Sequence, residues 1–368
     1  MKVILLGATG AMGRRAAEAL AQSPEVEVLT LTGRRLEAVQ ALAEELGGPS
    51  RAITLDVNDY DALVSALKGH DVAAGAIGPY YLYETLLAKA AIVAGVSYVS
   101  ICDDHDAAQD VFALDNAAKE RGVTILTGAG WTPGLTNILA KKGVSMLDEA
   151  KKVHIAWVGA LADADGVASL LHALHIFTGE VPTFSEGRHT TVRAGTGKEI
   201  VTFPEPIGPV DVYHTGHPEP ITIPRFIPGL EEVTLRGGLN EALVSRLTRM
   251  LTRMGLTHTP EARDRLLRLM KPFLPLIQKL SGPPKPISGA HVAVHGVKDG
   301  KPAVIEMTAV GRMRDLTALP QVVATLMVGR REVSLPGVIA PEAPGGPDPD
   351  RFLAALEEMG LTIETRVS

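Results

Sequence analysis

The chain has 368 residues, enough for about two domains at roughly 150 residues each. Its formal charge of −6 at pH 7 supplies no positive field, so neither nucleic acid nor an anionic membrane is an expected partner. Aromatic residues make up only 4%, which favours a core of Ala, Val, Leu and Ile in helices packed on sheets. The one cysteine, Cys102, excludes an internal disulfide and a cysteine-cluster metal site, and we expect no bound metal.

Targeting signals are not visible in this sequence. It shows neither a basic-then-apolar leader nor an apolar run of the about 18 residues that a spanning helix needs. We therefore expect a cytoplasmic protein that binds a small-molecule substrate. Residues 268–280 are apolar with scattered cations, and a subunit interface or lid is favoured there over a membrane surface.

Strand-like apolar runs alternate with helical patterns through the first third of the chain. We expect strands at 3–6, 26–31, 52–55, 72–76, 98–101 and 123–126, and helices at 14–22, 36–46, 60–67, 83–94 and 107–121. This alternation with short links is typical of an α/β fold with a parallel sheet covered on both faces.

The pattern changes at about residue 151 to strands and to segments broken by Gly and Pro, with one helix at 166–178. This predicts a second, α+β domain built on a mostly antiparallel, open sheet. Later elements are expected as helices at 240–280, 316–328 and 349–359, the first with a start at Pro260, and as strands at 291–297 and 303–309.

We place a nucleotide-binding domain at 1–148 with a returning segment at 312–368, and a domain for substrate binding and dimerisation at 149–311. The open sheet face of the second domain predicts a homodimer.

A glycine-rich turn follows the first predicted strand and precedes the helical pattern that begins at Arg14. Its glycines are Gly7, Gly10 and Gly13, in the spacing G-x-x-G-x-x-G. Gly7 permits the tight turn, Gly10 lets the backbone approach a pyrophosphate, and Gly13 lets helix and strand pack closely. The N–H groups and positive dipole of the helix start would then face phosphates. The turn therefore predicts a dinucleotide site in a doubly wound Rossmann domain, with a ligand-free turn as the alternative.

The residues after the second predicted strand select the cofactor. Arg34 and Arg35 stand where an NAD-binding protein usually carries Asp or Glu for the ribose 2′-hydroxyl. A guanidinium binds a 2′-phosphate bidentately, so we expect NADP rather than NAD, with a solvated helix start as the alternative. Asp56, after the third strand, either accepts from the adenine amino group or caps the next helix. The expected cofactor-binding residues are Gly7, Thr9, Gly10, Ala11, Met12, Gly13, Arg34, Arg35, Asp56, Val57, Ala76, Ile77, Gly78 and Pro79.

Short motifs follow one another along the chain in a specific order. They are 7–13, 33–34, 78–80, 95–99 with Asp103 following, 133–135, 172–182, 216–220, 311–313 and 336–342. With these motifs the chain resembles the saccharopine dehydrogenase family, which includes saccharopine reductases, lysine 6-dehydrogenases and carboxynorspermidine dehydrogenases. The resemblance implies a nicotinamide-dependent oxidoreductase whose hydride goes to or from a carbon bearing nitrogen, usually on an amino-acid substrate.

The same resemblance implies roles for particular residues. Tyr80 would line the nicotinamide site, and Asp103 would face the substrate together with the segment Trp131, Thr132 and Pro133. Thr132 stands where saccharopine reductases have the Asp of an Asp-Pro-Gly turn, and Thr136-Asn137 replace a more acidic pair. These departures argue against saccharopine itself as the substrate, and Asn137 is a candidate substrate contact.

Reduction of an imine or carbonyl also requires a proton donor. Tyr80 and Asp103 are the catalytic candidates because both follow strand ends at the expected cofactor edge. Tyr80 could instead wall the cofactor, and Asp103 could cap the helix near Ala107.

Histidines and arginines of the second domain are further substrate candidates. His172 and His175 lie three residues apart on one helix face, either toward the substrate or in an interface, and lack the nearby carboxylate of a metal set. Arg225 is one of three arginines able to bind a substrate carboxylate. Two other functions stay open: a carbonyl or enoyl reductase on the same scaffold, and a non-catalytic NADP-binding sensor.

Overall fold

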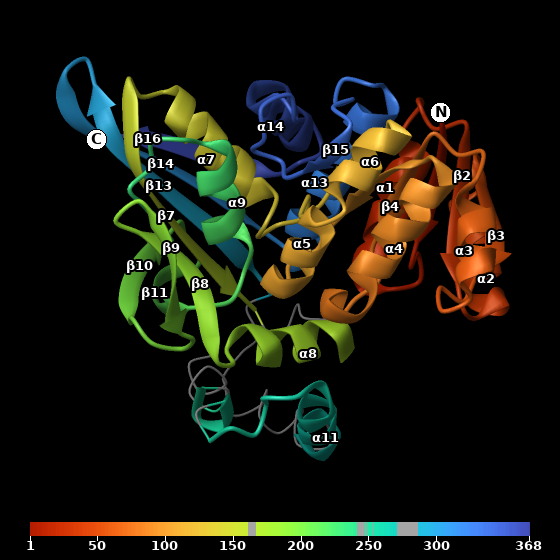
Figure 1. The fold of residues 1–368 in the computed structure, drawn as a ribbon, viewed down its shortest axis with the longest axis horizontal. Coiled ribbons are helices and arrows are strands. Elements are labelled where there is room, and N and C mark those ends of the chain that lie inside the picture. Colours follow the sequence, from red (N-terminus) through yellow and green to blue (C-terminus); the bar gives the residue numbers. More distant parts are fainter. Residues whose placement is uncertain (161–166, 241–246, 248, 253, 271–285) are drawn as a thin grey trace. The chain divides into compact units, whose positions relative to one another are not determined.

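A computed structural model describes residues 1–160, 167–240, 247, 249–252, 254–270 and 286–368 (Figure 1). Within these residues the chain forms two compact units, each with its own sheet. Unit 1 comprises Met1–Ile138 and Thr317–Met359, and unit 2 comprises Leu139–Leu316 and Gly360–Ser368. The expected fold class, α/β with a second domain on another sheet, is confirmed.

Unit 1 is built on a seven-stranded sheet in the order β15-β6-β5-β4-β1-β2-β3. Its strands are β1 (Lys2–Leu6), β2 (Val28–Gly33), β3 (Ser50–Thr54), β4 (Val72–Gly75), β5 (Ser97–Ser100), β6 (Thr124–Leu126) and β15 (Gly337–Ile339). All neighbouring strands pair in parallel. The strand order reverses between β1 and β4, and in such sheets the ligand binds at the carboxyl edge of this switch point.

Helices connect these strands, and their apolar residues bury the sheet. They are α1 (Ala11–Gln22), α2 (Leu36–Leu46), α3 (Tyr60–Leu67), α4 (Tyr80–Ala94), α5 (His105–Phe112), α6 (Asp115–Arg121) and α14 (Pro349–Glu358). Two more helices, α7 (Leu135–Ser145) and α13 (Met313–Gly329), each begin in one unit and end in the other. The single helix expected at 107–121 is divided into α5 and α6. Asp115 begins the second helix, and its carboxylate accepts a hydrogen bond from the N–H of Val338 at 2.9 Å, a long-range contact that no local pattern reveals.

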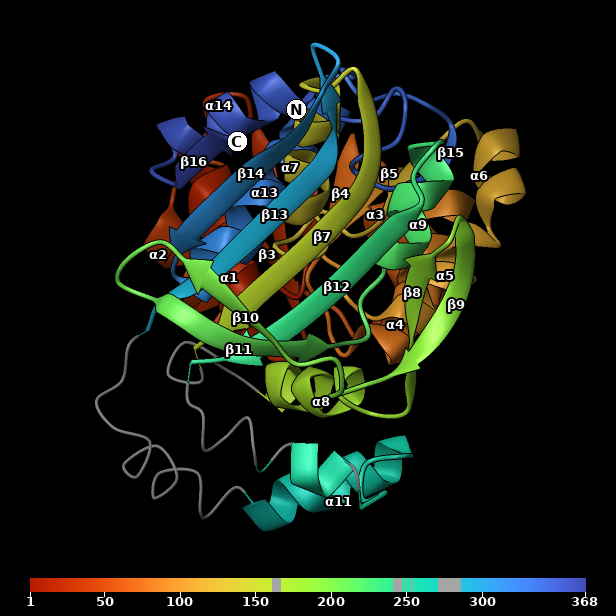
Figure 2. The same ribbon diagram turned by 90° about the vertical axis from the view of Figure 1, so that its left-hand side faces the viewer.

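Unit 2 contains a nine-stranded mixed sheet (Figure 2). Its strands are β7 (Glu149–Gly159), β8 (Glu180–Ser185), β9 (Arg188–Arg193), β10 (Glu199–Phe203), β11 (Gly208–His214), β12 (Glu232–Leu239), β13 (Ser288–Lys298), β14 (Lys301–Gly311) and β16 (Thr362–Val367). Most neighbours are antiparallel, as expected, whereas β7 and β12 pair in parallel.

Successive side chains of a strand point to opposite sides of this sheet. The side of β7 that carries Lys152 and His154 is polar there, whereas Ala156 and Val158 farther along the same side are buried in a cluster with Phe203 and Val212. Val153 and Ile155 of β7 are buried, whereas Lys152 and His154 of the same strand are more accessible. Figure 2 shows β14, β13, β7 and β12 side by side, and no described helix of unit 2 crosses the face turned to the viewer.

The helices of unit 2 include α8 (Val167–Ile176), α9 (Glu219–Phe226) and α11 (Pro260–Met270). α11 begins at Pro260, as the sequence predicts, whereas Gly166 and the stretch 271–285 lie outside the described residues. None of the described helices combines the length and apolar character needed to cross a bilayer.

The last strand was not expected from the sequence. β16 pairs with β14 through the register Thr362↔Val310 to Val367↔Ile305, so residues 360–368 belong to unit 2. The sequence instead placed them with the nucleotide-binding domain. Because β16 is largely exposed, its sequence has no alternation of apolar and polar residues that would predict a strand. Only its backbone pairing with β14 assigns it to this sheet.

Candidate cofactor and active site

The glycine-rich turn joins β1 to α1 and has the geometry of a phosphate-binding loop. Gly7 has φ +87, the left-handed conformation that glycine adopts without strain. Gly10 is the N-cap residue of α1, and no side chain caps this helix. The first turn also carries no acidic residue. The positive end of α1 is therefore available for an anion.

Close backbone approach explains why two of these positions are glycine. A Cβ added to Gly13 would overlap the carbonyl oxygen of Gly7 and lie 2.9 Å from the Gly7 carbonyl carbon. A Cβ added to Gly7 would lie 2.7 Å from Cγ1 of Ile77 and 2.8 Å from the carbonyl oxygen of Ala76. The structure thus brings the turn against the segment after β4, two stretches that the sequence assigned to one cofactor.

Arg34 and Arg35 lie directly after β2 and are exposed. Within the described part of the chain, neither guanidinium takes part in a hydrogen bond or an ion pair. A Cβ added to the neighbouring Gly33 would lie 3.3 Å from the hydroxyl of Thr9, so the phosphate loop and the arginine pair are adjacent. Two uncommitted cations beside the loop fit the 2′-phosphate of NADP.

Asp56 follows β3 and has a hydrogen-bonded carboxylate. Its Oδ1 accepts from the N–H of Asn58 at 3.0 Å and from the Asn58 amide at 2.9 Å. These bonds, more than the nearby Arg34, lower the pKa of Asp56. The cap of α3 is Asp59, which accepts from the N–H of Ala62 at 3.0 Å, so Asp56 does not serve as that cap. An adenine contact for Asp56 and the buried Val57 stays a prediction.

Tyr80 begins α4 and is 7% exposed. It packs in a cluster with Ile101 and Cys102, and Met12 of the phosphate loop and Ala76 lie against this cluster. Burial first, and then the charge of Asp103, raise the pKa of the Tyr80 hydroxyl well above its ordinary value of 10.0. The hydroxyl therefore stays protonated at neutral pH and can donate a hydrogen bond.

Two neighbouring carboxylates after β5 differ in environment. Asp103 is half-buried, whereas Asp104 is fully buried and its Oδ2 accepts from the N–H of Tyr81 at 2.9 Å. Asp104, rather than Asp103, is the N-cap residue of α5, and its side chain makes no capping hydrogen bond. Asp104 thus holds the first turn of α4, and the sequence did not single it out.

The loop between β6 and α7 contains Trp131, Thr132 and Pro133, all of them buried. Its backbone folds on itself, since the N–H of Gly130 donates to the carbonyl of Pro133 at 2.9 Å. Another backbone bond, from the N–H of Ala129 to the carbonyl of Ser100 at 2.6 Å, ties the loop to the end of β5. The aromatic residues expected at the cofactor edge therefore follow the ends of β4 and β6.

Asn137, a predicted substrate contact, is fully buried in α7. Its Oδ1 accepts from the N–H of Gly134 at 2.8 Å, and its Nδ2 donates to Oε2 of Glu342 at 2.9 Å. The oxygen and the nitrogen of the Asn137 amide thus both hydrogen-bond groups of the protein itself. A contact between Asn137 and the substrate stays a prediction.

The remaining candidates belong to unit 2. His172 Nε2 lies 3.2 Å from Nε2 of His217, and the His217 ring stacks on Trp157 at a centroid distance of 5.5 Å. His175 hydrogen-bonds the guanidinium of Arg263.

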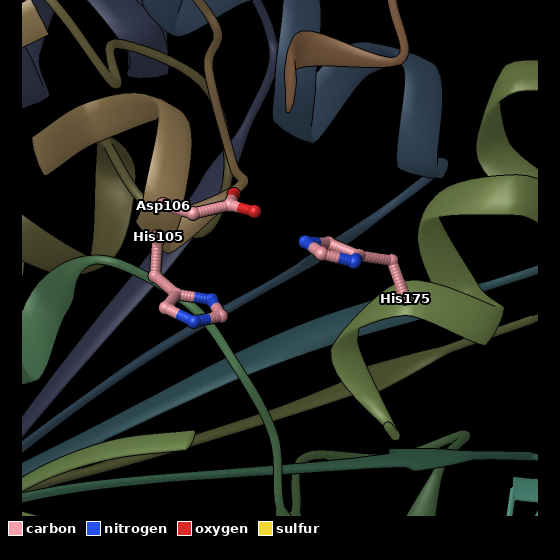
Figure 3. A group of neighbouring side chains, drawn as sticks. All are labelled: His105, Asp106 and His175. Atoms are coloured by element: carbon pink, nitrogen blue, oxygen red, sulfur yellow. The ribbon is translucent and has the colours of Figure 1, made fainter. Parts of the chain in front are cut away.

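Figure 3 shows His175 on α8, and His105 and Asp106 in the first turn of α5 of unit 1. Arg225 is exposed on α9, with its guanidinium 5.7 Å from the centroid of the Phe226 ring. Sequence reasoning did not single out His105 or Asp106.

The fold and the loop geometry define a class of protein: a Rossmann-type dinucleotide-binding protein with a phosphate loop at a helix start and an arginine pair beyond the second strand. Comparisons with known proteins agree with this assignment. Residues 3–126 match the family model described as saccharopine dehydrogenase NADP binding domain. The expected cofactor, NADP, is thereby confirmed.

Similar proteins carry related names. The chain is 31% identical over 153 residues to a saccharopine dehydrogenase [NADP(+), L-glutamate-forming] of Pyricularia oryzae, a match that covers 38% of this chain and 32% of that protein. It is 26% identical over 209 residues to a trans-acting enoyl reductase of Mycobacterium tuberculosis, covering 55% of this chain and 48% of that protein. The matches thus span less than half the length of these curated relatives.

One solved structure shares the whole fold. Apo saccharopine dehydrogenase (L-Glu forming) from Saccharomyces cerevisiae superposes with a TM-score of 0.70 at 19% identity, and the match covers 99% of both chains. Residues 3–126 thus match the NADP binding domain of saccharopine dehydrogenases, and the shared fold agrees with the resemblance that the motifs predicted.

Proposed function

We propose that this protein is a cytoplasmic, NADP-dependent oxidoreductase that moves hydride to or from a carbon bearing nitrogen in a small amino-acid-derived substrate. The observation that carries the proposal is the phosphate loop beside the uncommitted Arg34 and Arg35. The name of the Pyricularia oryzae relative supports the reaction class, since forming L-glutamate from saccharopine breaks a carbon–nitrogen bond.

The side chains near the cofactor edge suit this chemistry. When bound, NADP supplies or accepts the hydride. Tyr80, with its protonated hydroxyl, would donate a hydrogen bond to the nitrogen or oxygen of the substrate. Asp103 would orient an ammonium group. Burial raises the pKa of the Cys102 thiol well above its ordinary value, so little reactive thiolate forms at neutral pH.

Turnover with defined substrates tests the proposal. NADPH oxidation is followed with 2-oxo acids and amino acids supplied together, and NADP⁺ reduction with secondary amines of amino acids. We expect saturable turnover that Tyr80→Phe reduces by about 10²-fold or more. Tyr83→Phe, on the same helix, is the matched control because its hydroxyl has no hydrogen-bond partner among the described residues. Equal activity of Tyr80→Phe and the wild type would refute the role of Tyr80.

Enoyl or carbonyl reduction is the second candidate. It is favoured by the similarity to the trans-acting enoyl reductase, which extends over 209 residues compared with 153 for the saccharopine dehydrogenase. Enoyl thioesters in the same NADPH assay distinguish the two reactions. NADPH binding with no turnover of either substrate class would leave a non-catalytic sensor.

We also propose that the open sheet face of unit 2, around Lys152 and His154, forms a homodimer interface. Lys152, His154 and Glu232 interact on this face, with His154 Nε2 3.0 Å and Lys152 Nζ 3.4 Å from the Glu232 carboxylate. Charges of both signs suit a two-fold interface, where one patch faces itself. Analytical ultracentrifugation tests the proposal: we expect a dimer that Glu232→Lys weakens, and a monomeric wild type would refute it.

A further inference from the structure

A carboxyl group is enclosed in unit 1 beside the proposed reaction site. Glu84 is fully buried on α4, one helical turn after Tyr80. Its Oε2 accepts a hydrogen bond from the hydroxyl of Tyr98 at 3.0 Å. Its Oε1 accepts from the hydroxyl of Ser100 and, at 3.3 Å, from that of Thr127. The donors come from β5 and from the residue that follows β6.

This cluster reaches the strand ends that form the cofactor edge. A Cβ added to Gly75, the last residue of β4, would overlap the Tyr98 hydroxyl, so Tyr98 places its oxygen against that strand end. Ser100 ends β5, and Thr127 directly follows β6. The Glu84 carboxyl thus lies among the carboxyl ends of β4, β5 and β6, and β4 adjoins the switch point of the sheet.

Hydrogen bonding favours the charged form of Glu84. An ionised carboxylate only accepts hydrogen bonds, and three hydroxyls donate to it. A protonated carboxyl would have to donate, so one of these hydroxyls would need to reverse its own hydrogen bond. Hydrogen bonding therefore opposes the cost of burying the charge.

Among the described residues, none of the groups named as acting on Glu84 carries a positive charge. Four titratable groups interact electrostatically with Glu84, and all of them are acids. They are Tyr80 of α4, Tyr98 of β5, and Cys102 and Asp104 after β5. Burial raises the pKa of Glu84 to about 7, so the charge of this carboxyl changes near neutral pH. A buried anion of this kind stabilises a positive charge that binds nearby.

We propose that Glu84, held by Tyr98, Ser100 and Thr127, is a positioning residue whose negative charge favours the oxidised, cationic nicotinamide ring over the reduced, neutral ring. This inference rests on the proposed function, because NADP must bind at this edge. Contacts to the cofactor phosphates do not distinguish NADP⁺ from NADPH, whereas the charge of Glu84 would. The carboxyl acts through the enclosed hydroxyls and strand ends, and needs no direct contact with the substrate.

The proposal predicts how the affinities for NADP⁺ and NADPH change with pH. Because only the ionised carboxylate favours the cationic ring, the affinity ratio of NADP⁺ to NADPH rises as Glu84 loses its proton. A difference of half a pKa unit between the two complexes changes this ratio about threefold. Titration of the 2′-phosphate is common to both cofactor forms, so it cancels from the ratio.

Direct binding measurements test this inference. The affinity for NADPH is measured by its fluorescence and that for NADP⁺ by competition, at about pH 6, 7 and 8. We expect the ratio to rise at least about threefold in the wild type and to stay flat in Glu84→Gln. Tyr98→Phe removes one donor to the carboxylate, so the midpoint of the rise moves to higher pH. His105→Gln, which removes a histidine in the first turn of α5, keeps the rise.

Each outcome decides the inference. An unchanged rise in Glu84→Gln, or a flat ratio in the wild type, overturns it. If the affinity ratio of NADP⁺ to NADPH no longer rises with pH in His105→Gln but still rises in Glu84→Gln, the inference is overturned and the histidine is the responsible group. If Glu84→Gln does not fold in a thermal melt, the midpoint in Tyr98→Phe decides, and an unshifted midpoint overturns the inference. Absence of any NADP(H) binding refutes the proposed function and this inference together, whereas tight binding with a flat ratio refutes this inference alone.

Discussion

Replacing Glu84 by Gln should change how the stability of the apoprotein depends on pH. The folded protein holds this carboxyl with a pKa of about 7, compared with an ordinary value of 4.5. In the window between these values the folded state binds more protons than the unfolded state, so the free energy of unfolding falls as pH rises. The contribution of protonated Glu84 is fully present below pH 4.5 and is lost as pH rises through about 7.

The size of the effect follows from the same two pKa values. One pKa unit corresponds to about 1.4 kcal/mol, so the full loss is on the order of 3 kcal/mol. Urea denaturation of the wild type and Glu84→Gln at about pH 5 and about pH 8 measures it, and other titrating groups cancel from the difference. We expect the variant to gain stability relative to the wild type by roughly this amount between the two pH values. Parallel pH profiles for the two proteins would refute the reasoning.

Three further predictions concern the cofactor loop and the fold of unit 1. In the wild type, charge-assisted hydrogen bonds to the 2′-phosphate should make the affinity for NADPH about 10- to 100-fold higher than that for NADH. The double variant Arg34→Ala with Arg35→Ala should remove this preference. Equal affinities of the wild type for the two cofactors in a fluorescence titration would contradict the prediction. Gly13→Ala should lower the free energy of unfolding, measured by urea denaturation, by about 1–3 kcal/mol, because the new Cβ would overlap backbone atoms. Gly10→Ala should lower it less, because its Cβ would meet only one oxygen, at 3.4 Å. Equal losses in the two variants would contradict the packing argument. Asn137→Ala should lower the Tm and the free energy of unfolding by about 1–3 kcal/mol, since its amide holds two buried partners. An unchanged Tm would show that this amide is dispensable.

The first unit was largely predictable because its signals are local. Alternating apolar runs and helical patterns located its six leading strands, and the glycine spacing located the phosphate turn. Expected boundaries differed by a few residues, as at α4, which begins at Tyr80 rather than at residue 83. The division of α5 from α6 escaped prediction, and Asp115 at the start of α6 has a partner, Val338, that lies far along the chain.

Chemical roles were less predictable than the strands and helices. Tyr80 and Asp103 were proposed as catalytic candidates because the carboxyl ends of parallel strands lie at one edge, a rule that sequence order reveals, and their roles stay predictions. Glu84 and Asp104 were not found. In the sequence each is an acidic residue in or before a helix, a type that is usually solvated. Their burial became evident only when the hydroxyls of Tyr98 and Ser100 and the N–H of Tyr81 were seen to donate to them.

The sequence by itself therefore determined the α/β class and the NADP-binding turn, because periodicity and glycine spacing are properties of neighbouring residues. Only the tertiary structure decided the environment of each polar group. It enclosed Glu84 among three hydroxyls, paired Asn137 with Glu342, and added β16 to the sheet of unit 2. These outcomes depend on burial and on contacts between distant positions, where the cost of desolvating a charge is balanced by donors that the local sequence does not contain.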